Sequence, residues 1–184
     1  MTLELQALWV QLQEDWSVHE RDSTKPGFRA VAVHRFGNYV RNYWLMKRRS
    51  RFIGRLLWSV YQLLYRRVRN RYGIEVYHTT KLGRRVVFGH QNGIVIHPNA
   101  EIGDDCLIRQ NVTIGAVTDA RSYEAPKLGS GVRVGCGAVI VGNVTIGDGA
   151  IIGPNTVIMD NVPPGARVFA ESPRVMPVPA PRSL

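Results

Sequence analysis

The 184-residue sequence predicts a mainly β protein, a left-handed parallel β-helix with an N-terminal α-helical region. Aliphatic residues recur every six positions from Ile96 onward, and two further columns run in step with them. Residues 1–72 lack this period and show helical spacing of apolar residues instead. A six-residue period means alternating short strands and turns, so each coil must stack on its neighbours to bury an apolar face.

The helical region is predicted to contain two helices. The segment "KPGFRAVAVHRFGNYVRN" starts at a Pro-Gly break, and its apolar residues then follow helical spacing. In "RFIGRLLWSVYQLLYRRVRNRYG", Gly73 is the expected stop and one apolar stripe runs along the helix. The stripe comprises Ile53, Leu56, Leu57, Val60, Leu63, Leu64 and Val68.

Residues 47–71 carry nine Lys or Arg residues and no acid, whereas the formal net charge of the chain is +10. The basic charge is therefore local. We expect this helix to pack on the solenoid or on a partner subunit. Contact with an anionic membrane surface is the alternative, because Trp58 and Tyr61 accompany the arginines. Nucleic acid is not expected as a partner, since no reading motif accompanies the charge.

The repeat region, residues 73–171, is defined by three columns. The aliphatic column comprises Ile96, Ile102, Ile108, Ile114, Leu128, Val134, Ile140, Ile146, Ile152 and Ile158. Three residues later come Asn99, Asp105, Asn111, Gly131, Gly137, Asn143, Gly149, Asn155 and Asn161, residue types that tolerate the positive φ of a turn. One residue further come Ala100, Cys106, Val112, Val132, Ala138, Val144, Ala150, Thr156 and Val162. We expect the aliphatic and small columns to point inward, with a loop, "AVTDARSYEAPK", interrupting them after Ile114.

The period breaks once upstream of these columns. Val76, Leu82 and Phe88 keep the six-residue step, but the next aliphatic in phase, Ile96, comes eight residues later. Two residues are inserted, and His90 lies in the unit that carries them. An irregularity of this kind re-aims side chains and is common next to sites.

The composition of the chain bears on the cellular compartment in which we expect it. The N-terminus is acidic and unlike a signal peptide, and no apolar run reaches the ~18 residues needed to span a bilayer. Only Cys106 and Cys136 occur, so we expect a reducing, cytoplasmic setting, with the inner membrane surface as an option for the basic helix. The proline-rich tail, residues 172–184, is expected to be extended.

Four segments together resemble bacterial serine O-acetyltransferases, most closely the short members associated with polysaccharide gene clusters. They are "RDST" at 21–24, "GFRAVAVHRFGNYV" at 27–40, "GHQNGIVI" at 89–96 and the hexapeptide array. The resemblance implies that His90 is the general base that deprotonates an acceptor hydroxyl. It also implies that Glu75, where the family has Asp, orients the imidazole.

The resemblance is less complete for the acceptor. Asp22 matches an acceptor-binding Asp, but Gly89 stands where the family has a second Asp, and Glu124-Ala125 replace an Arg-His pair. Arg121 is close enough in the loop to substitute for that Arg. Glu124 therefore places a negative charge where the family has an Arg that would bind the carboxylate of the acceptor. We therefore expect an acetylated hydroxyl, preferably of a saccharide or its precursor, with serine as the alternative.

For the donor, the resemblance implies acetyl-CoA bound in a groove between subunits of a homotrimer. The matching segments are Gly135-Cys136-Gly137 and residues 150–154, which include Ala150, Ile151 and Pro154. Arg133, Arg167 and Arg174 are candidates for the phosphate end of the cofactor. No metal is expected, because His90 and His97 do not form the ligand pattern of a zinc enzyme on this solenoid. A non-catalytic scaffold docked through the basic helix is the remaining alternative.

Overall fold

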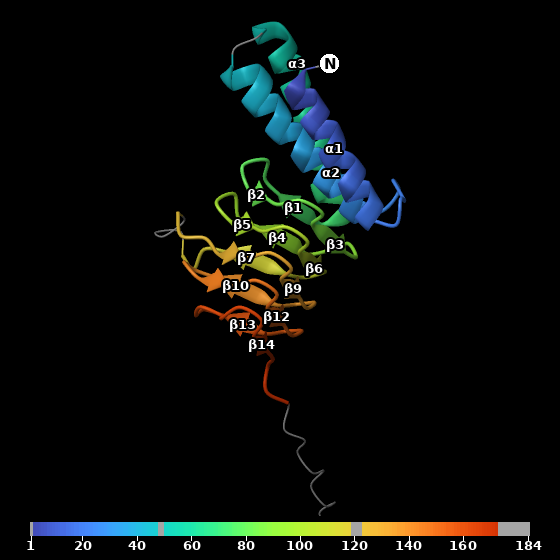
Figure 1. Ribbon diagram of the computed structural model, residues 1–184. Coiled ribbons are helices and arrows are strands. Elements are labelled where there is room, and N and C mark those ends of the chain that lie inside the picture. Colours follow the sequence, from blue (N-terminus) through green and yellow to red (C-terminus); the bar gives the residue numbers. More distant parts are fainter. Residues whose placement is uncertain (1, 48–49, 119–122, 173–184) are drawn as a thin grey trace, which may run out of the picture.

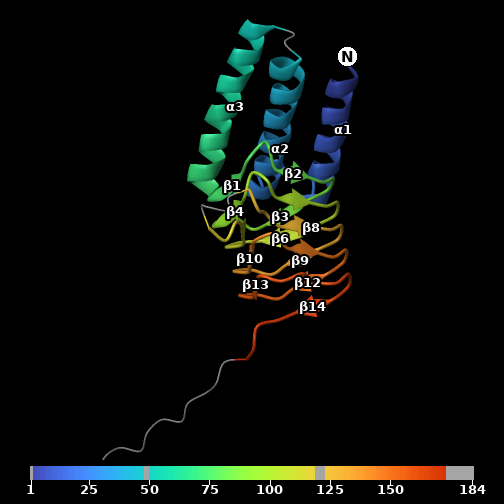
Figure 2. The same cartoon turned by 90° about the vertical axis from the view of Figure 1, so that its left-hand side faces the viewer.

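The computed structural model describes residues 2–47, 50–118 and 123–172. Its helices stand at one end of a stack of short strands (Figure 1). They are α1 (Leu3–Val18), α2 (Pro26–Tyr39), the π-helical segment η1 (Val40–Met46) and α3 (Arg51–Tyr72). Helix α2 lies between α1 and α3 (Figure 2). The two predicted helices are confirmed, and α1 is an addition that the sequence pattern did not predict.

Local signals set the helix ends. Helix α1 is capped by Thr2, whose hydroxyl accepts a bond from the Leu5 N–H at 3.4 Å, and Ser50 caps α3 in the same way through the Ile53 N–H. Pro26 occupies the first turn of α2. Helix α3 ends at Gly73, which has a φ of +62° as the predicted stop requires.

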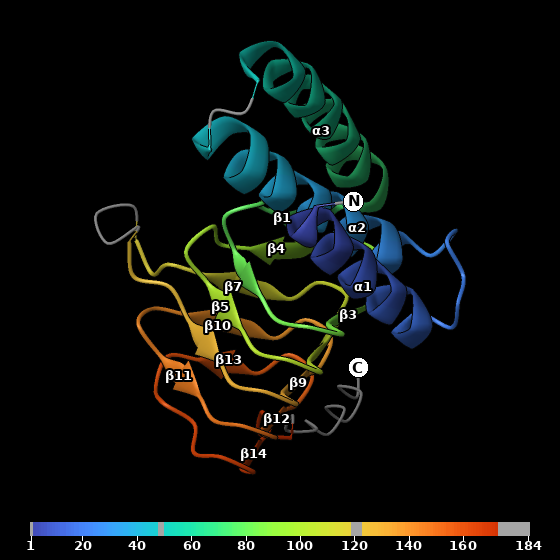
Figure 3. The ribbon, with the colours of Figure 1, turned by 45° about the horizontal axis from the view of Figure 1, so that its top comes forward.

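The strands form three parallel sheets that wind around one core (Figure 3). Their strand orders are β1-β4-β7-β10-β13, β11-β8-β5-β2 and β14-β12-β9-β6-β3, so each strand pairs with its equivalents in the next coils. The solenoid prediction is confirmed. The bounds are β1 Ile74–Val76, β2 Lys81–Leu82, β3 Val87–Gly89, β4 Ile94–Ile96, β5 Glu101–Ile102, β6 Leu107–Arg109, β7 Thr113–Gly115, β8 Lys127–Leu128, β9 Arg133–Val134, β10 Val139–Val141, β11 Thr145–Ile146, β12 Ile151–Ile152, β13 Val157–Ile158 and β14 Arg167–Val168.

The predicted inward columns form the core. Every residue of the aliphatic and small columns is buried, and the register stacks equivalents directly, as in Ile96 on Ile114 and Ile114 on Ile140. This stacking removes the apolar face of each coil from water. The turn column is correct at Asp105, Asn111, Gly131, Gly137, Gly149 and Asn155, which have positive φ. Asn99, Asn143 and Asn161 do not have positive φ, although Asn99 still lies in a turn. Beside Asn143, Gly142 takes the left-handed conformation instead.

The buried face of α3 differs from the predicted stripe. Gly54, Tyr61, Val68 and Tyr72 are buried, whereas five of the predicted residues are exposed. The exposed residues are Ile53, Leu56, Val60, Leu63 and Leu64. The buried tyrosines Tyr72 and Tyr61 have polar partners: Arg29 donates to the Tyr72 hydroxyl at 2.5 Å, and the Tyr61 hydroxyl lies 3.3 Å from His78 Nδ1. Helix α3 does pack on the solenoid, as expected, but through Val68 and Tyr72 near β1 and not through the exposed residues of the aliphatic stripe.

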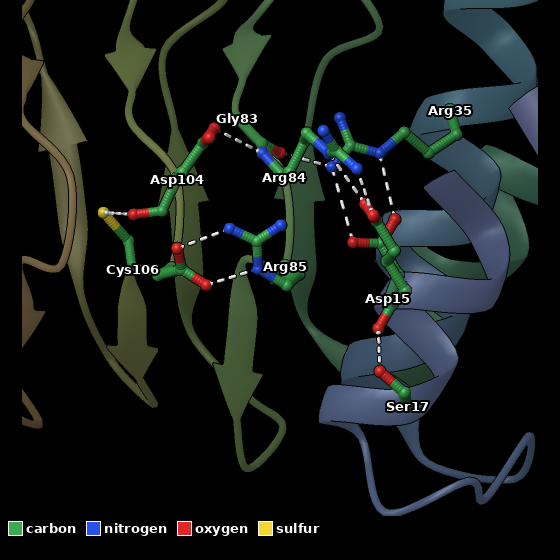
Figure 4. A network of polar contacts seen from close by, with 10 residues as sticks. Asp15, Ser17, Arg35, Gly83, Arg84, Arg85, Asp104 and Cys106 are labelled. Carbon is green, nitrogen blue, oxygen red and sulfur yellow. Dashed lines mark hydrogen bonds and ion pairs between the residues drawn. The ribbon is translucent and has the colours of Figure 1, made fainter. Parts of the chain in front are cut away.

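Side chains of α2 attach the helices to the first coil. Arg35 donates to the carbonyls of Leu82 (2.7 Å) and Gly83, and His34 bonds the Thr80 carbonyl at 3.0 Å. Arg35 also pairs with Asp15 of α1, with 3.0 Å between Nε and Oδ2, and both side chains are almost fully buried (Figure 4). One guanidinium thus connects α1, α2 and the turn after β2.

Within the described part of the chain, no helix combines the length and the apolarity needed to cross a bilayer. Of the predicted extended tail, only Ser172 belongs to the described residues.

Candidate active site

The coil is interrupted at the position that the sequence predicts. His90 follows the last residue of β3, and β4 begins only at Ile94. His90, Asn92 and Gly93 have φ values of +71°, +90° and +65°, so the chain makes a left-handed bend there. Asn92 anchors the bend, because its N–H donates to the Tyr72 carbonyl (2.8 Å) and its carbonyl accepts from the Asn111 N–H (2.9 Å). The His90 side chain is exposed on this bend.

His90 borders a hollow of about 370 Å³ between the helices and the solenoid. One side of it comes from the end of α1 and the start of α2, the other from β3 and β6. The lining residues are Val18, His19, Glu20, Lys25, Pro26, Gly27, Val87, Phe88, Gly89, His90, Leu107 and Arg109. Its volume suits a small metabolite. We call it the His90 cavity.

Gly27 and Phe88, which both line the His90 cavity, come into close contact. A Cβ added to Gly27 would lie 2.2 Å from the Phe88 carbonyl oxygen and 3.1 Å from His19 Nε2. Any other residue at this position would separate α2 from β3. Gly27 therefore lets the first turn of α2 rest directly on the strand that leads to His90.

His19 is the C-cap residue of α1 and is buried. Its Nδ1 lies 2.6 Å from the Asp15 carbonyl oxygen. Its Nε2 is buried and has no hydrogen-bond partner among the described residues. Burial lowers the pKa of His19 and so favours the neutral ring, although the Asp15 carbonyl opposes this shift.

A second hollow, of about 190 Å³, runs along the outer face of the next coils. It is lined by Leu107, Arg109, Arg133, Val134, Gly135, Cys136, Ile151, Ile152, Gly153, Pro154 and Phe169. We call it the coil groove. Leu107 and Arg109 belong to both hollows, so the coil groove continues from the His90 cavity. A molecule lying along the groove can therefore present one end beside His90.

Five of the predicted donor residues line the coil groove: Arg133, Gly135, Cys136, Ile151 and Pro154. Gly135 has a structural reason for its size, because a Cβ there would lie 2.6 Å from the Pro154 nitrogen of the next coil. Gly137 does not line the groove; it forms a turn with a φ of +71°, beside Asn155 of the next coil.

Ala150, another predicted donor residue, does not line the coil groove. It is fully buried in the core, and its carbonyl and N–H bond Arg133 (2.9 Å) and Gly147 (3.2 Å) within the solenoid. Its side chain is therefore closed off from a ligand in the groove. Arg167 pairs in register with Ile151 and is exposed next to the groove without lining it. Arg174 lies outside the described residues.

The predicted pairing of His90 with Glu75 is not formed. The Tyr77 hydroxyl donates to Glu75 Oε1 at 2.7 Å, and no hydrogen bond joins Glu75 to His90 in the described part of the chain. Glu75 lies on β1 and Tyr77 follows two residues later, so both side chains project from the same side of the coil. Tyr77 thus holds one of the two carboxylate oxygens of the residue that we expected to orient the imidazole.

The predicted acceptor residues are not gathered in one place. Asp22 lies in the α1–α2 connection, where its Oδ1 accepts from the Thr24 N–H (2.7 Å) and hydroxyl (2.6 Å). These two bonds lower the pKa of Asp22. Asp22 does not line the His90 cavity, although its neighbours Glu20 and Lys25 do. Glu124 borders neither hollow, and Arg121 lies outside the described residues.

Four polar residues that line the cavity were not predicted from the sequence: His19, Glu20, Lys25 and Arg109. Arg109 pairs in register with Gly89, the residue before His90, and has no ion pair among the described residues. Arg109 could have been predicted from the six-residue period. It takes an outward position on the coil next to the inserted residues, and such a position faces the site. His19 carries no such signal, since only the packing of α1 brings it to the cavity. In the described ranges, no group of three or more His, Cys, Asp or Glu side chains is placed to hold a metal ion.

Comparison with known proteins gives a consistent result. A family model described as bacterial transferase hexapeptide (six repeats) matches residues 125–160, and such repeats indicate the left-handed form of the β-helix. A serine acetyltransferase of Synechococcus elongatus is 34% identical over 161 residues, which cover 83% of this chain and 61% of the relative. A serine acetyltransferase of Helicobacter pylori is 34% identical over 141 residues, covering 77% of this chain and 75% of the relative. The structure of a soybean serine acetyltransferase complexed with serine superposes with a TM-score of 0.72 at 28% identity, covering 92% of this chain and 69% of that chain.

Proposed function

Because the chain belongs to the serine acetyltransferase family of hexapeptide-repeat proteins, we propose that it transfers the acetyl group of acetyl-CoA to the hydroxyl of serine. The observation that carries the proposal is the position of His90, exposed at the His90 cavity, which shares Leu107 and Arg109 with the coil groove. A small acceptor fits the cavity, and an extended donor fits the groove. The relatives are named for serine, which supports serine over the saccharide that Gly89 and Glu124 led us to prefer.

The reaction needs a base and a leaving thiol. The His90 imidazole takes the proton of the acceptor hydroxyl as the oxygen attacks the thioester carbonyl carbon. A C–O bond forms, the C–S bond breaks as the tetrahedral intermediate collapses, and the proton held by His90 passes to the sulfur. Ring nitrogens of His90 have no partner among the described residues, so nothing in that part of the chain competes with the acceptor for them.

For the donor, we propose that the adenosine phosphates lie towards Arg133 and Arg167 and the pantetheine arm lies along Gly135, Cys136 and Ile151. Arg133 and Ile151 line the groove, and Arg167 is exposed beside it in register with Ile151. Guanidinium groups bind phosphates strongly. Within one chain the groove remains open to solvent, and excluding water from a thioester requires a second wall. We therefore propose a homotrimer in which a neighbouring subunit supplies that wall.

Thiol release from acetyl-CoA tests the proposal with L-serine and, in parallel, with neutral hexoses and N-acetylhexosamines as acceptors. We expect turnover with serine, and His90→Ala should lower it by about 10²–10⁴-fold, the usual contribution of a general base. His97→Ala is the matched control, because His97 lies outside both hollows and its Nδ1 accepts from the Asn99 N–H at 3.2 Å. Turnover with sugars alone would refute the acceptor, and full activity of His90→Ala would refute the mechanism.

A further inference from the structure

Four polar residues of the His90 cavity have no role in the proposed reaction. Lys25 and Glu20 pair with each other, whereas His19 Nε2 and the Arg109 guanidinium have no polar partner among the described residues. We propose that they recognise the acceptor as an α-amino acid: His19 accepts a hydrogen bond from its ammonium group and Arg109 binds its carboxylate. This inference rests on the proposed transfer to a hydroxyl. It assigns the residues that select the acceptor molecule carrying that hydroxyl.

The tautomer of His19 follows from its partner. The Asp15 carbonyl, 2.6 Å from Nδ1, can only accept, so Nδ1 carries the proton and Nε2 presents a lone pair. A buried lone pair without a partner costs free energy, which a donor in the cavity would recover. The charged groups near His19 are Asp15, Lys25 and Glu20. Asp15 pairs with Arg35, and Lys25 pairs with Glu20 at 2.6 Å. An ammonium group of the acceptor supplies the missing donor.

Arg109 lies on β6, in register with Gly89, the residue before His90. It projects outward from β6, and Gly89 opposite it has no side chain, so a Cβ there would lie 3.8 Å from Arg109 Cγ. Lys25 is already paired with Glu20, whereas Arg109 has no carboxylate partner among the described residues. A guanidinium binds a carboxylate with two parallel hydrogen bonds, which fixes its orientation as well as its position.

In this proposal three groups contact the acceptor: the Nε2 lone pair of His19, the basic imidazole of His90 and the guanidinium of Arg109. Serine carries an ammonium, a hydroxyl and a carboxylate on three adjoining carbons and matches all three. A neutral sugar has no anionic group for Arg109, so that charge would remain unpaired. The cavity therefore favours a zwitterionic acceptor over a neutral one.

The test measures serine binding by calorimetry and steady-state kinetics with L-serine, L-serinamide and 3-hydroxypropionate. We expect Arg109→Gln to raise the KM and the Kd for serine at least tenfold while leaving the KM for serinamide, which lacks the carboxylate, unchanged. We expect His19→Phe to weaken serine binding but not that of 3-hydroxypropionate, which lacks the ammonium. Arg133→Gln is the matched control on the next coil and should raise the KM for acetyl-CoA only.

The assignment of Arg109 would be overturned if Arg109→Gln lost affinity for serine and serinamide alike. It would also be overturned if only the KM for acetyl-CoA changed. Unchanged serine affinity in His19→Phe would overturn that of His19. These outcomes differ from failure of the proposed function, in which the wild-type protein itself does not acetylate serine.

A separate observation concerns the outer face of α3. Phe52, Leu56 and Leu63 are 79%, 56% and 68% exposed, and Ile53, Val60 and Leu64 lie beside them. The opposite face holds the helix in place through Gly54, Tyr61, Val68 and Tyr72. The apolar stripe therefore faces away from the protein.

Arginines adjoin this stripe. Arg66, Arg67 and Arg71 line a shallow hollow together with Leu63 and Leu64. No acidic residue occurs between positions 47 and 71. Apolar side chains that enter the acyl region and arginines that meet phosphates are the two elements of an interfacial helix. We infer that this face binds the surface of an anionic bilayer.

Co-sedimentation with vesicles tests the inference. The full-length protein should sediment with phosphatidylcholine vesicles that contain phosphatidylglycerol and much less with phosphatidylcholine alone, and 0.5 M salt should weaken the binding. Leu56→Gln with Leu63→Gln should abolish it. Val157→Gln is the matched control, an exposed apolar residue of the solenoid.

Equal binding by the two variants, or no binding to the anionic vesicles, would overturn the inference. A changed oligomeric state in the Leu56→Gln, Leu63→Gln variant would also overturn it, because the stripe would then be a subunit interface.

Discussion

Replacing Asp15 with Asn should strongly destabilise the protein. Asp15 and Arg35 are 1% and 5% exposed at their side chains, and their ion pair is the buried link between α1 and α2. The substitution leaves the guanidinium charge buried without a counter-ion, and breaking a buried pair in this way costs about 3–5 kcal/mol. Arg35 keeps its bonds to the carbonyls of Leu82 and Gly83, so we expect a loss near the lower limit, about 3 kcal/mol.

Thermal unfolding at one fixed protein concentration measures this loss. A change of about 3 kcal/mol corresponds to a fall in Tm of roughly 6–12 °C for a chain of this size. Because α1 carries His19 to the His90 cavity, the KM for serine should rise while the KM for acetyl-CoA stays constant. Both readouts follow from one contact (Figure 4).

Glu14→Gln is the matched control. Glu14 pairs with Arg84 across the same boundary between α1 and the solenoid, but the two side chains are 23% and 49% exposed. An exposed pair contributes about 0–1 kcal/mol, so the Tm should hardly change. If Glu14→Gln destabilises the protein as much as Asp15→Asn, burial is not what gives the Asp15–Arg35 pair its importance.

Three further outcomes are expected. Burial, reinforced by the charge of Arg35, lowers the pKa of His34 to about 4, so between pH 6.5 and 4 the unfolded chain binds a proton that the folded chain excludes. Stability should therefore fall by about 3 kcal/mol as the pH drops through that window, and His34→Gln should flatten the slope of Tm against pH. Gly27→Ala should lower the Tm and raise the KM for serine, since its Cβ would meet the Phe88 carbonyl; a rise in Tm, which helix propensity alone predicts, would contradict this. N-ethylmaleimide should label Cys136 in the coil groove, and CoA should slow this labelling. Cys106 should resist labelling, because it is buried and burial raises its pKa to about 11. Faster labelling of Cys106 than of Cys136 would contradict the placement of both.

The solenoid could be predicted because its determinants are local. Each coil repeats the same inward residues, so positions such as Ile114 and Ile140 are defined by period alone and stack as expected. The break of that period also located the bend at His90.

Contacts between elements could not be predicted in this way. Helix α1 buries only Asp15 of its own residues, and that carboxylate acquires its role from Arg35, 20 residues further on. On α3, hydrophobicity favoured the aliphatic stripe, but Tyr61 and Tyr72 are buried because their hydroxyls find partners elsewhere in the fold. The site residues Arg109 and His19 likewise depend on sheet register and helix packing.

The attachment of α2 to the first coil has a consequence for self-assembly. A stack of parallel strands ends in unpaired backbone groups, and two such ends can join and grow into fibres. Here the carbonyls of His78, Thr80, Leu82 and Gly83 accept hydrogen bonds from Asn38, His34 and Arg35. Helix α2 therefore blocks end-to-end polymerisation on that side, and a fragment lacking residues 1–72 would expose a template for it.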